Sequence, residues 1–365
     1  SGSSGGHEMH FKWDKSAMET DIRNCSIKEH SAWMEEFSDE WSRPFLIVDS
    51  EVRKLWDSQL KQLILSASGI FVMEALEEQK NISTLTGIWN TMSEKGIHRD
   101  TPVVVIGGGL VCDIGAMAAS TYLRGLRLTL VPTTLLCMVD ACLGGKTGLN
   151  FSGAKNQLGT FYPAEKIAIS PEFLETLPER EFRSGIAEII KTAIIGDRSI
   201  QKSLEKIDVE NPDREVILEI VRKCLEVKGG IVTGDLRETG NRMILNLGHT
   251  IGHAIESSSG FQFSHGEAVG LGLIGEAAIA ANLGGNTELP GEIRHLLEMA
   301  GLPAGVSGSV SGEKLLRMFD KDKKTRKDGR IWSLPFNWSD CRLTFLTSDQ
   351  EEQLLPEAMN LLMSS

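Results

Sequence analysis

The sequence lacks the features that would place it in several specialised classes of protein. Its six cysteines include no C-x-x-C pair and no tight framework spacing, so we expect reduced thiols and a cytoplasmic location. No apolar run reaches the roughly 18 residues that a membrane-spanning helix needs. The net charge is −12 and no basic block is present, which makes nucleic acid and anionic membranes poor partners.

Two common catalytic motifs are also incomplete. Thr250 stands where the metalloprotease pattern H-E-x-x-H needs its glutamate. The run Gly144–Thr147 (G-G-K-T) looks like the end of a P-loop, but Asp140 occupies the position of the first glycine of that motif. Neither motif is therefore supported, and Lys146 needs another explanation.

The first part of the chain alternates between apolar runs and helical patterns. Strands are predicted at Arg43–Ser50, Gly69–Ala75, Thr101–Ile106 and Leu126–Val131, and helices at Glu51–Ser68, Ile82–Gly96 and Leu110–Tyr122. This alternation predicts parallel βαβ units with ligands at the carboxyl ends of the strands. The glycine turn 107–109 favours dinucleotide binding, although Cys112 ends the partial G-x-G-x-x-G match. Asp49 and Asp113 are acids that could reach a ribose hydroxyl.

The length of 365 residues allows one very large domain or two of ordinary size. The Ser/Gly-rich residues 1–10 are expected to be a remnant of cloning, because they lack the apolar region of a signal peptide. We predict an α/β, Rossmann-like dinucleotide-binding domain over residues 11–170. Residues 171–365 are predicted to form a mostly α-helical metal- and substrate-binding domain.

Three of the eight histidines lie in the stretch Asn241–Glu267, at His249, His253 and His265. The first two are four residues apart, so on a helix they share one face, and Arg242 and Asn246 are predicted to continue that face. A third histidine that returns to such a pair predicts a zinc site with three protein ligands. The alternative is a chance pair of histidines in an ordinary helix.

Charged residues in unusual surroundings support a polar site. Glu188 and Lys191 are three residues apart in the otherwise apolar segment Gly185–Ile195, which predicts either a buried ion pair or a metal ligand. Each cation alone is more often a solvated surface charge, whereas the whole set in so acidic a chain suggests an anionic ligand. This set comprises Arg124, Lys146, Lys155, Lys191, Lys228 and Arg242.

Seven runs together resemble one known family. They are G-G-G-L-V-C-D, R-G-L-R-L-T-L-V-P-T-T, V-D-A-C-L-G-G-K-T-G-L-N, G-A-K-N-Q-L-G-T-F-Y, G-I-A-E-I-I-K, N-L-G-H-T-I-G-H-A-I-E and H-G-E-A-V. In order and spacing they resemble the 3-dehydroquinate synthase family of sugar-phosphate cyclases, from about Arg43 to Arg330. The resemblance implies a carbon–oxygen lyase of the shikimate pathway, which leads to chorismate and the aromatic amino acids. The implied reaction converts 3-deoxy-D-arabino-heptulosonate 7-phosphate to 3-dehydroquinate and phosphate.

The resemblance also implies recycled NAD+, a zinc or cobalt ion, a sugar-phosphate substrate and a homodimer. The implied metal ligands are Glu188, His249 and His265, and His253 is then a catalytic residue that does not bind the metal. Further catalytic and substrate positions are Arg124, Asp140, Lys146, Asn156, Lys191, Lys228, Arg242 and Asn246. The implied NAD+ contacts are Asp49, Glu77, Lys80, Gly107, Gly108, Gly109, Asp113, Thr133, Thr134, Lys146, Lys155, Phe173, Thr176 and Glu181. Glu238 is a further match, and a late lysine falls on Lys323 or Lys324.

Some segments depart from the family pattern. Leu76 replaces the glycine usual before the E-x-x-K of the NAD+ site, and neither Phe11–Trp41 nor the end from Ile331 matches well. That end is predicted to form a hairpin of Ile331–Leu334 and Arg342–Thr347, followed by a helix over Glu351–Met363. The alternatives are a metal-dependent polyol or alcohol dehydrogenase, a sister cyclase acting on an amino analogue or another sugar phosphate, and a binding protein with an inactive site.

Overall fold

The computed structural model describes residues 9–13, 18–29, 33–35, 43–260, 262–306, 310–323 and 328–363. The chain forms two compact units. The first unit runs to Pro178 and includes Val232–Arg237, and the second comprises Glu179–Ile231 and the residues from Glu238 onward. What each predicted domain binds remains a prediction.

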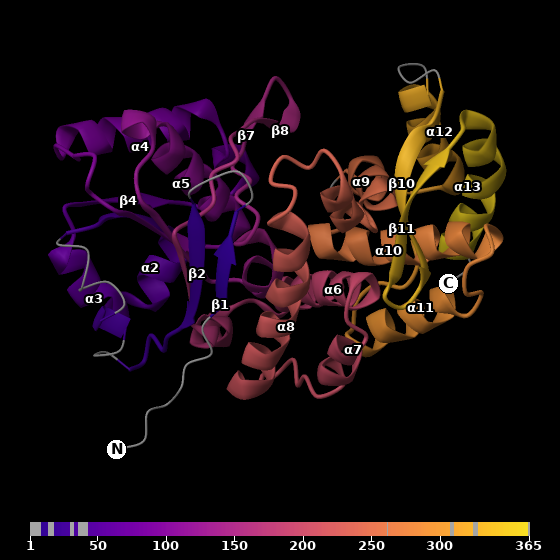
Figure 1. The fold of residues 1–365 in the computed structure, drawn as a ribbon, viewed down its shortest axis with the longest axis horizontal. Coiled ribbons are helices and arrows are strands. Elements are labelled where there is room, and N and C mark those ends of the chain that lie inside the picture. Colours follow the sequence, from indigo (N-terminus) through magenta and orange to yellow (C-terminus); the bar gives the residue numbers. More distant parts are fainter. Residues whose placement is uncertain are drawn as a thin grey trace. The chain divides into compact units, whose positions relative to one another are not determined.

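A seven-stranded sheet organises the described part of the first unit (Figure 1). Its order is β1-β2-β9-β6-β5-β3-β4, and the pairs are parallel except β1 with β2. The strands are β1 Met9–Lys12, β2 Glu19–Asn24, β3 Phe45–Asp49, β4 Gly69–Met73, β5 Val103–Gly107, β6 Leu128–Pro132 and β9 Lys166–Ile169. Every residue of β3, β5 and β6 is buried, as near-continuous apolar runs require in a parallel sheet. The four strands predicted from apolar runs are confirmed.

Helices and short turns connect these strands. They are α2 Ser50–Leu55, α3 Asp57–Ser66, η1 Glu77–Gln79, α4 Ile82–Glu94, α5 Gly109–Thr121, η2 Tyr122–Arg124, the π-helical turn η3 Cys137–Ala141 and η4 Pro171–Thr176. A hairpin of β7 Leu149–Phe151 and β8 Ala154–Leu158 stands apart from the large sheet. The single helix predicted over Glu51–Ser68 is wrong, because the backbone leaves the helical region at Trp56, with φ −114° and ψ 25°.

The second unit is mostly helical and is built around α10. Its elements are α6 Glu179–Ile195, α7 Ser199–Leu204, α8 Arg214–Val232, η5 Asn241–Asn246, α9 His249–Ser258, α10 His265–Asn282, α11 Leu289–Met299, α12 Gly312–Lys323, β10 Arg330–Asn337, β11 Asp340–Leu346 and α13 Ser348–Met363. Buried residues run along α10 from Gly266 to Ala280, and α6, α9, α11, α13 and β10 contact it (Figure 1). The predicted late hairpin and closing helix are confirmed.

One prediction about the histidine segment is wrong. Arg242 and Asn246 were expected on the same helix face as His249, but they belong to the separate 3-10 turn η5. The chain then becomes extended at Leu247 and left-handed at Gly248, with φ +79°, before α9 begins at His249. A glycine adopts this left-handed conformation without the steric cost that a side chain would add, so it separates the two elements.

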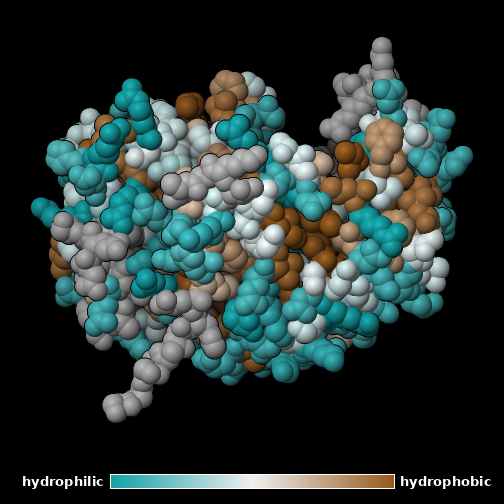
Figure 2. Space-filling view, in the orientation of Figure 1, coloured by the Kyte–Doolittle hydropathy of each residue, from teal (hydrophilic) through white to brown (hydrophobic). Residues whose placement is uncertain are grey.

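The described helices include none that is both long and apolar enough to cross a membrane. Hydrophilic side chains, drawn teal, are spread over the face seen in Figure 2, including the lower part over α8, whereas hydrophobic side chains, drawn brown, gather to the right of that helix. This agrees with the alternating burial of α8, in which Glu226 is exposed while Cys224 and Leu225 are buried.

Candidate functional site

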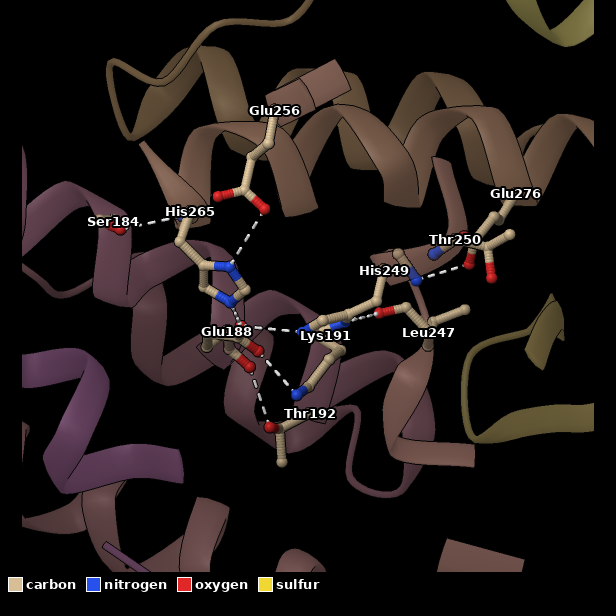
Figure 3. Close-up of polar contacts among 12 residues, drawn as sticks. Ser184, Glu188, Lys191, Thr192, Leu247, His249, Thr250, Glu256, His265 and Glu276 are labelled. Atoms are coloured by element: carbon tan, nitrogen blue, oxygen red, sulfur yellow. Dashed lines mark hydrogen bonds and ion pairs between the residues drawn. The ribbon is translucent and has the colours of Figure 1, made fainter. Parts of the chain in front are cut away.

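Three side chains from three helices of the second unit converge on one point (Figure 3). Glu188 comes from α6, while His249 and His265 are the first residues of α9 and α10. Oε1 of Glu188 lies 3.0 Å from Nε2 of His265 and 3.7 Å from Nε2 of His249. The ligand-type atoms of all three residues lie within 4.8 Å of one another, as residues that share one metal ion require.

Glu188 and Lys191 form the buried pair that the apolar segment predicted. They are 1% and 2% exposed, and Nζ of Lys191 lies 2.7 Å from Oε2 of Glu188. A carboxylate this deeply buried needs a partner charge to stay ionised. The sequence left open whether Glu188 forms an ion pair or binds a metal. The two roles are compatible, since Oε2 forms the ion pair with Lys191 and Oε1 faces the histidines.

His249 is oriented by the backbone before its helix. Its Nδ1 lies 3.0 Å from the carbonyl oxygen of Leu247, which can only accept, so Nδ1 carries the proton and Nε2 presents its lone pair toward Glu188. Burial lowers the pKa of His249 to about 4, although Glu188 opposes this shift. The imidazole is therefore neutral near pH 7, which is the form that binds metals.

His265 lies between two carboxylates. Nδ1 is 3.8 Å from Oε2 of Glu256, and Nε2 contacts Glu188 (Figure 3). Burial lowers the pKa of His265, but the neighbouring carboxylates of Glu188 and Glu256 outweigh burial and raise it to about 10, so binding of a metal ion at this imidazole would release a proton. The start of α10 is fixed by a capping box between Ser264 and Glu267.

Two imidazoles and one carboxylate are a donor set that suits zinc or cobalt, and three protein ligands leave a position open for a substrate oxygen. The sequence analysis missed Glu256, whose carboxylate lies beside the imidazole of His265. It falls at the end of the run N-L-G-H-T-I-G-H-A-I-E, seven residues and so two turns after His249. This spacing could have identified Glu256 from the sequence as a candidate neighbour of the metal ligands.

His253 lies outside the three-residue cluster. Its side chain is exposed, and its ring centroid is 5.5 Å from that of His249. This position fits a group that acts near the metal ligands, and its catalytic role remains a prediction.

The other predicted residues of the second unit differ in burial. Lys228 and Arg242 are buried, Glu238 is half-buried, and Glu181, Asn246 and His253 are exposed. Nδ2 of Asn246 donates to Oε1 of Glu238 at 2.9 Å, which joins two predicted positions. The candidate Lys323 ends α12, but its side chain and the whole of Lys324 lie outside the described residues.

The predicted phosphate turn of the first unit lies at the carboxyl ends of β5 and β6. A Cβ atom on Gly107 would lie 2.7 Å from Val111, and one on Gly108 would lie 2.8 Å from Thr134. Gly108 is the N-cap of α5 and makes no side-chain hydrogen bond to the first backbone N–H groups of this helix. Such a helix start suits an anion, and Thr133 and Thr134 flank it.

Several predicted cofactor residues of the first unit form one polar network. Nζ of the buried Lys80 donates to Asp113 at 2.6 Å and to Oδ1 of Asn156 at 2.7 Å. Asn150 links this group to Glu77, because its Nδ2 donates to Glu77 at 2.6 Å and its Oδ1 accepts from the Asn156 backbone at 3.0 Å. Residues assigned separately to NAD+ and substrate therefore contact one another.

Three predicted NAD+ contacts also have structural roles. Asp49 caps α2 by accepting from the Glu51 N–H at 2.9 Å, while burial raises its pKa. The Phe173 ring packs against Trp56 at a centroid distance of 5.2 Å, and Thr176 accepts a hydrogen bond from the Trp56 indole at 2.9 Å. The first unit also places Asp140 in η3, half-buried, and leaves three predicted cations exposed, namely Arg124, Lys146 and Lys155.

Comparison with known proteins identifies relatives of the chain. Models of the 3-dehydroquinate synthase N-terminal and C-terminal regions match residues 70–184 and 185–325. A 3-dehydroquinate synthase from Prochlorococcus marinus (strain MIT 9211) is 41% identical over 266 residues, which cover 71% of this chain and 71% of that protein.

Solved structures agree in fold. A 2-deoxy-scyllo-inosose synthase complexed with carbaglucose-6-phosphate, NAD+ and Co2+ has a TM-score of 0.85 at 22% identity, covering 96% of this chain and 100% of that chain. A 2-epi-5-epi-valiolone synthase from Streptomyces hygroscopicus subsp. jinggangensis 5008, with NAD+ and Zn2+ bound, has a TM-score of 0.82 at 26% identity, covering 95% and 98%. Because the two family models together match residues 70–325, the chain belongs to the 3-dehydroquinate synthase family.

Proposed function

We propose that this protein is a 3-dehydroquinate synthase, a carbon–oxygen lyase that converts 3-deoxy-D-arabino-heptulosonate 7-phosphate to 3-dehydroquinate and phosphate. The observation that carries the proposal is the convergence of Glu188, His249 and His265, with Lys191 beside them, in a chain of this family. We further propose that it acts in the cytoplasm as a homodimer, in the shikimate pathway.

Glu188, His249 and His265 would hold a zinc or cobalt ion, since their donor atoms suit either metal. When bound, such an ion lowers the pKa of a coordinated alcohol and so eases its deprotonation. The protein contributes neutral His249 and an ionised Glu188, both of which are ready to bind a cation. The zinc bound in the related 2-epi-5-epi-valiolone synthase supports this assignment.

The residues of the first unit would hold NAD+, which when bound accepts a hydride from the substrate and returns it. The uncapped start of α5 at Gly108 would receive a phosphate group. The network of Lys80 and Asp113 supplies a cation and an acid for the polar parts of the cofactor. NAD+ in the same related synthase supports this use of the fold.

The cationic residues would bind the carboxylate and phosphate of the substrate. In the second unit Lys191, Lys228 and Arg242 provide buried positive charge, and Arg242 can engage an anion with two parallel hydrogen bonds. His253 is exposed one helical turn after His249, where it could exchange a proton with the substrate. A polyol dehydrogenase has no need of such an anion-binding set.

Phosphate release tests this proposal. With zinc, NAD+ and 3-deoxy-D-arabino-heptulosonate 7-phosphate, we expect phosphate and 3-dehydroquinate in equal amounts, and both should stop when a chelator removes the metal. Parallel assays with the amino analogue and with other sugar phosphates separate the sister cyclases. Activity on one of those compounds alone would contradict the proposed substrate.

A further inference from the structure

A second buried carboxylate lies close to the metal-ligand cluster. Glu276 belongs to the apolar helix α10 and is 0% exposed. Its carboxylate accepts three backbone hydrogen bonds, from the N–H groups of Gly248 at 2.5 Å, Thr250 at 3.1 Å and Ile251 at 3.2 Å. Figure 3 shows Glu276 reaching the backbone beside Thr250, on the far side of His249 from Glu188.

The first N–H groups of α9 require hydrogen-bond acceptors from outside the helix. The first N–H groups of a helix have no acceptor within the helix, and a side chain at the N-cap usually supplies one. Here the N-cap is Gly248, which makes no side-chain cap bond. Glu276 supplies the missing acceptor from a neighbouring helix, because its two oxygens accept from three N–H groups at this helix start.

Close packing of the two helices makes this contact possible. Gly272 lies one turn before Glu276, and a Cβ atom there would lie 1.9 Å from the carbonyl oxygen of Gly248 and 2.9 Å from the backbone nitrogen of Gly252. The backbones of α9 and α10 therefore approach more closely than any side chain at 272 would allow. Glu276 follows on the same face of α10 and reaches the first turn of α9.

We propose that Glu276 is a positioning residue for the metal centre, which fixes the first turn of α9 and thereby the places of His249 and His253. His249 is the first residue of that turn, so any change in where the helix begins moves its imidazole relative to Glu188. This inference rests on the proposed function, because it assumes that His249 binds the metal. It assigns to Glu276 no direct contact with metal or substrate.

The test compares Glu276→Gln and Glu276→Met with Glu351→Gln. Glutamine keeps one oxygen acceptor, methionine keeps the approximate size without any acceptor of comparable strength, and Glu351 is a matched control in the same unit. Glu351 is 6% exposed and accepts from Arg330 and Trp332 through its side chain, without a side-chain bond to α9. Zinc affinity is measured by competition with a chelator, and the cobalt-loaded proteins are compared by visible absorption spectra.

We expect zinc affinity to fall in the order wild type, Glu276→Gln, Glu276→Met, with the methionine variant about 10–100-fold weaker, as for other groups that orient metal ligands. The cobalt spectrum should change in the same order, and Glu351→Gln should resemble the wild type. If Glu276→Met does not fold, the glutamine variant decides, through a weaker affinity and an altered spectrum.

The inference is overturned if the Glu276 variants that fold bind zinc as tightly as the wild type with an unchanged cobalt spectrum. It is also overturned if Glu351→Gln weakens zinc binding as much as Glu276→Gln, because the loss would then reflect general destabilisation. A wild-type chain that binds no zinc would contradict the proposed metal centre itself, together with this role.

Discussion

Glu188 carries two interactions that depend on each other. Its Oε2 meets Nζ of Lys191 at 2.7 Å, and its Oε1 faces His249 and His265. The ammonium group offsets part of the cost of burying the carboxylate, so the charge is retained where a cation would bind. The sequence shows that Glu188 and Lys191 lie in an apolar segment. Only the structure shows that one oxygen of Glu188 contacts Lys191 while the other faces the histidines.

We expect Glu188→Gln, His249→Ala and His265→Ala each to lose bound zinc, because each removes one of the three ligands proposed among the described residues. Elemental analysis after gel filtration measures the metal content. The matched control is Glu172→Gln, which alters a buried carboxylate of the first unit that accepts from Ser26 and Ser170. Stoichiometric zinc in all three site variants would show that the metal ligands are wrongly assigned.

His249 and His253 should differ although they lie one turn apart. We expect His253→Ala to keep zinc and NAD+ binding while turnover slows by about 10²–10⁴-fold, as for the loss of a general acid–base group. His249→Ala should lose metal and activity together, since its Nε2 faces Glu188. Zinc content and turnover of both variants give the answer. Equal zinc loss would instead indicate a closed site with four ligands, as in structural zinc centres.

At the scale of helices and strands, apolar runs within short segments predicted the buried strands correctly. The buried strands β3, β5 and β6 were predicted because apolar runs of that length suit a parallel sheet. The short strand β9 and the N-terminal pair β1 and β2 were not predicted, because four to six residues give little periodicity. The helix predicted from Arg242 through His249 is interrupted at Gly248, where the backbone is left-handed. Gly248 packs closely against α10, and the local sequence pattern does not predict this contact.

The contact between α9 and α10 predicts a dependence of stability on pH. Burial raises the pKa of Glu276 to about 8, although three backbone N–H groups favour its ionised form. An unfolded glutamate titrates near 4.5, so between these values the folded chain binds more protons than the unfolded chain. The contribution of Glu276 to stability therefore falls as the pH rises from about 4.5 to about 8.

Glu276→Gln removes this titration and provides the comparison. In urea unfolding with a chelator present, we expect the stability of the wild type relative to the variant to decrease steadily across that pH range. Cys341 should not interfere, because burial and the nearby Glu276 raise the pKa of its thiol. A difference that stays constant, or that grows in favour of the wild type as the pH rises, would contradict the expectation.

At the scale of the whole molecule, the family resemblance named residues that local patterns could not. Lys80, Asp113 and Asn156 lie far apart in sequence yet join in one network, because the strand order of the sheet and the β7–β8 hairpin bring them together. Sequence periodicity does not predict contacts between residues this far apart in the chain. The buried carboxylate Glu276 was missed for the same reason, since its backbone partners belong to another helix.

The central claim is that the protein uses NAD+ as a recycled catalyst in a phosphate-releasing cyclisation. One assay tests it most directly: phosphate and NADH absorbance are followed together in a reaction that holds zinc, excess 3-deoxy-D-arabino-heptulosonate 7-phosphate and NAD+ equal in amount to the enzyme. We predict that the phosphate released will far exceed the NAD+ supplied, while NADH does not accumulate. Steady NADH formation without phosphate release would contradict the claim and identify a dehydrogenase instead.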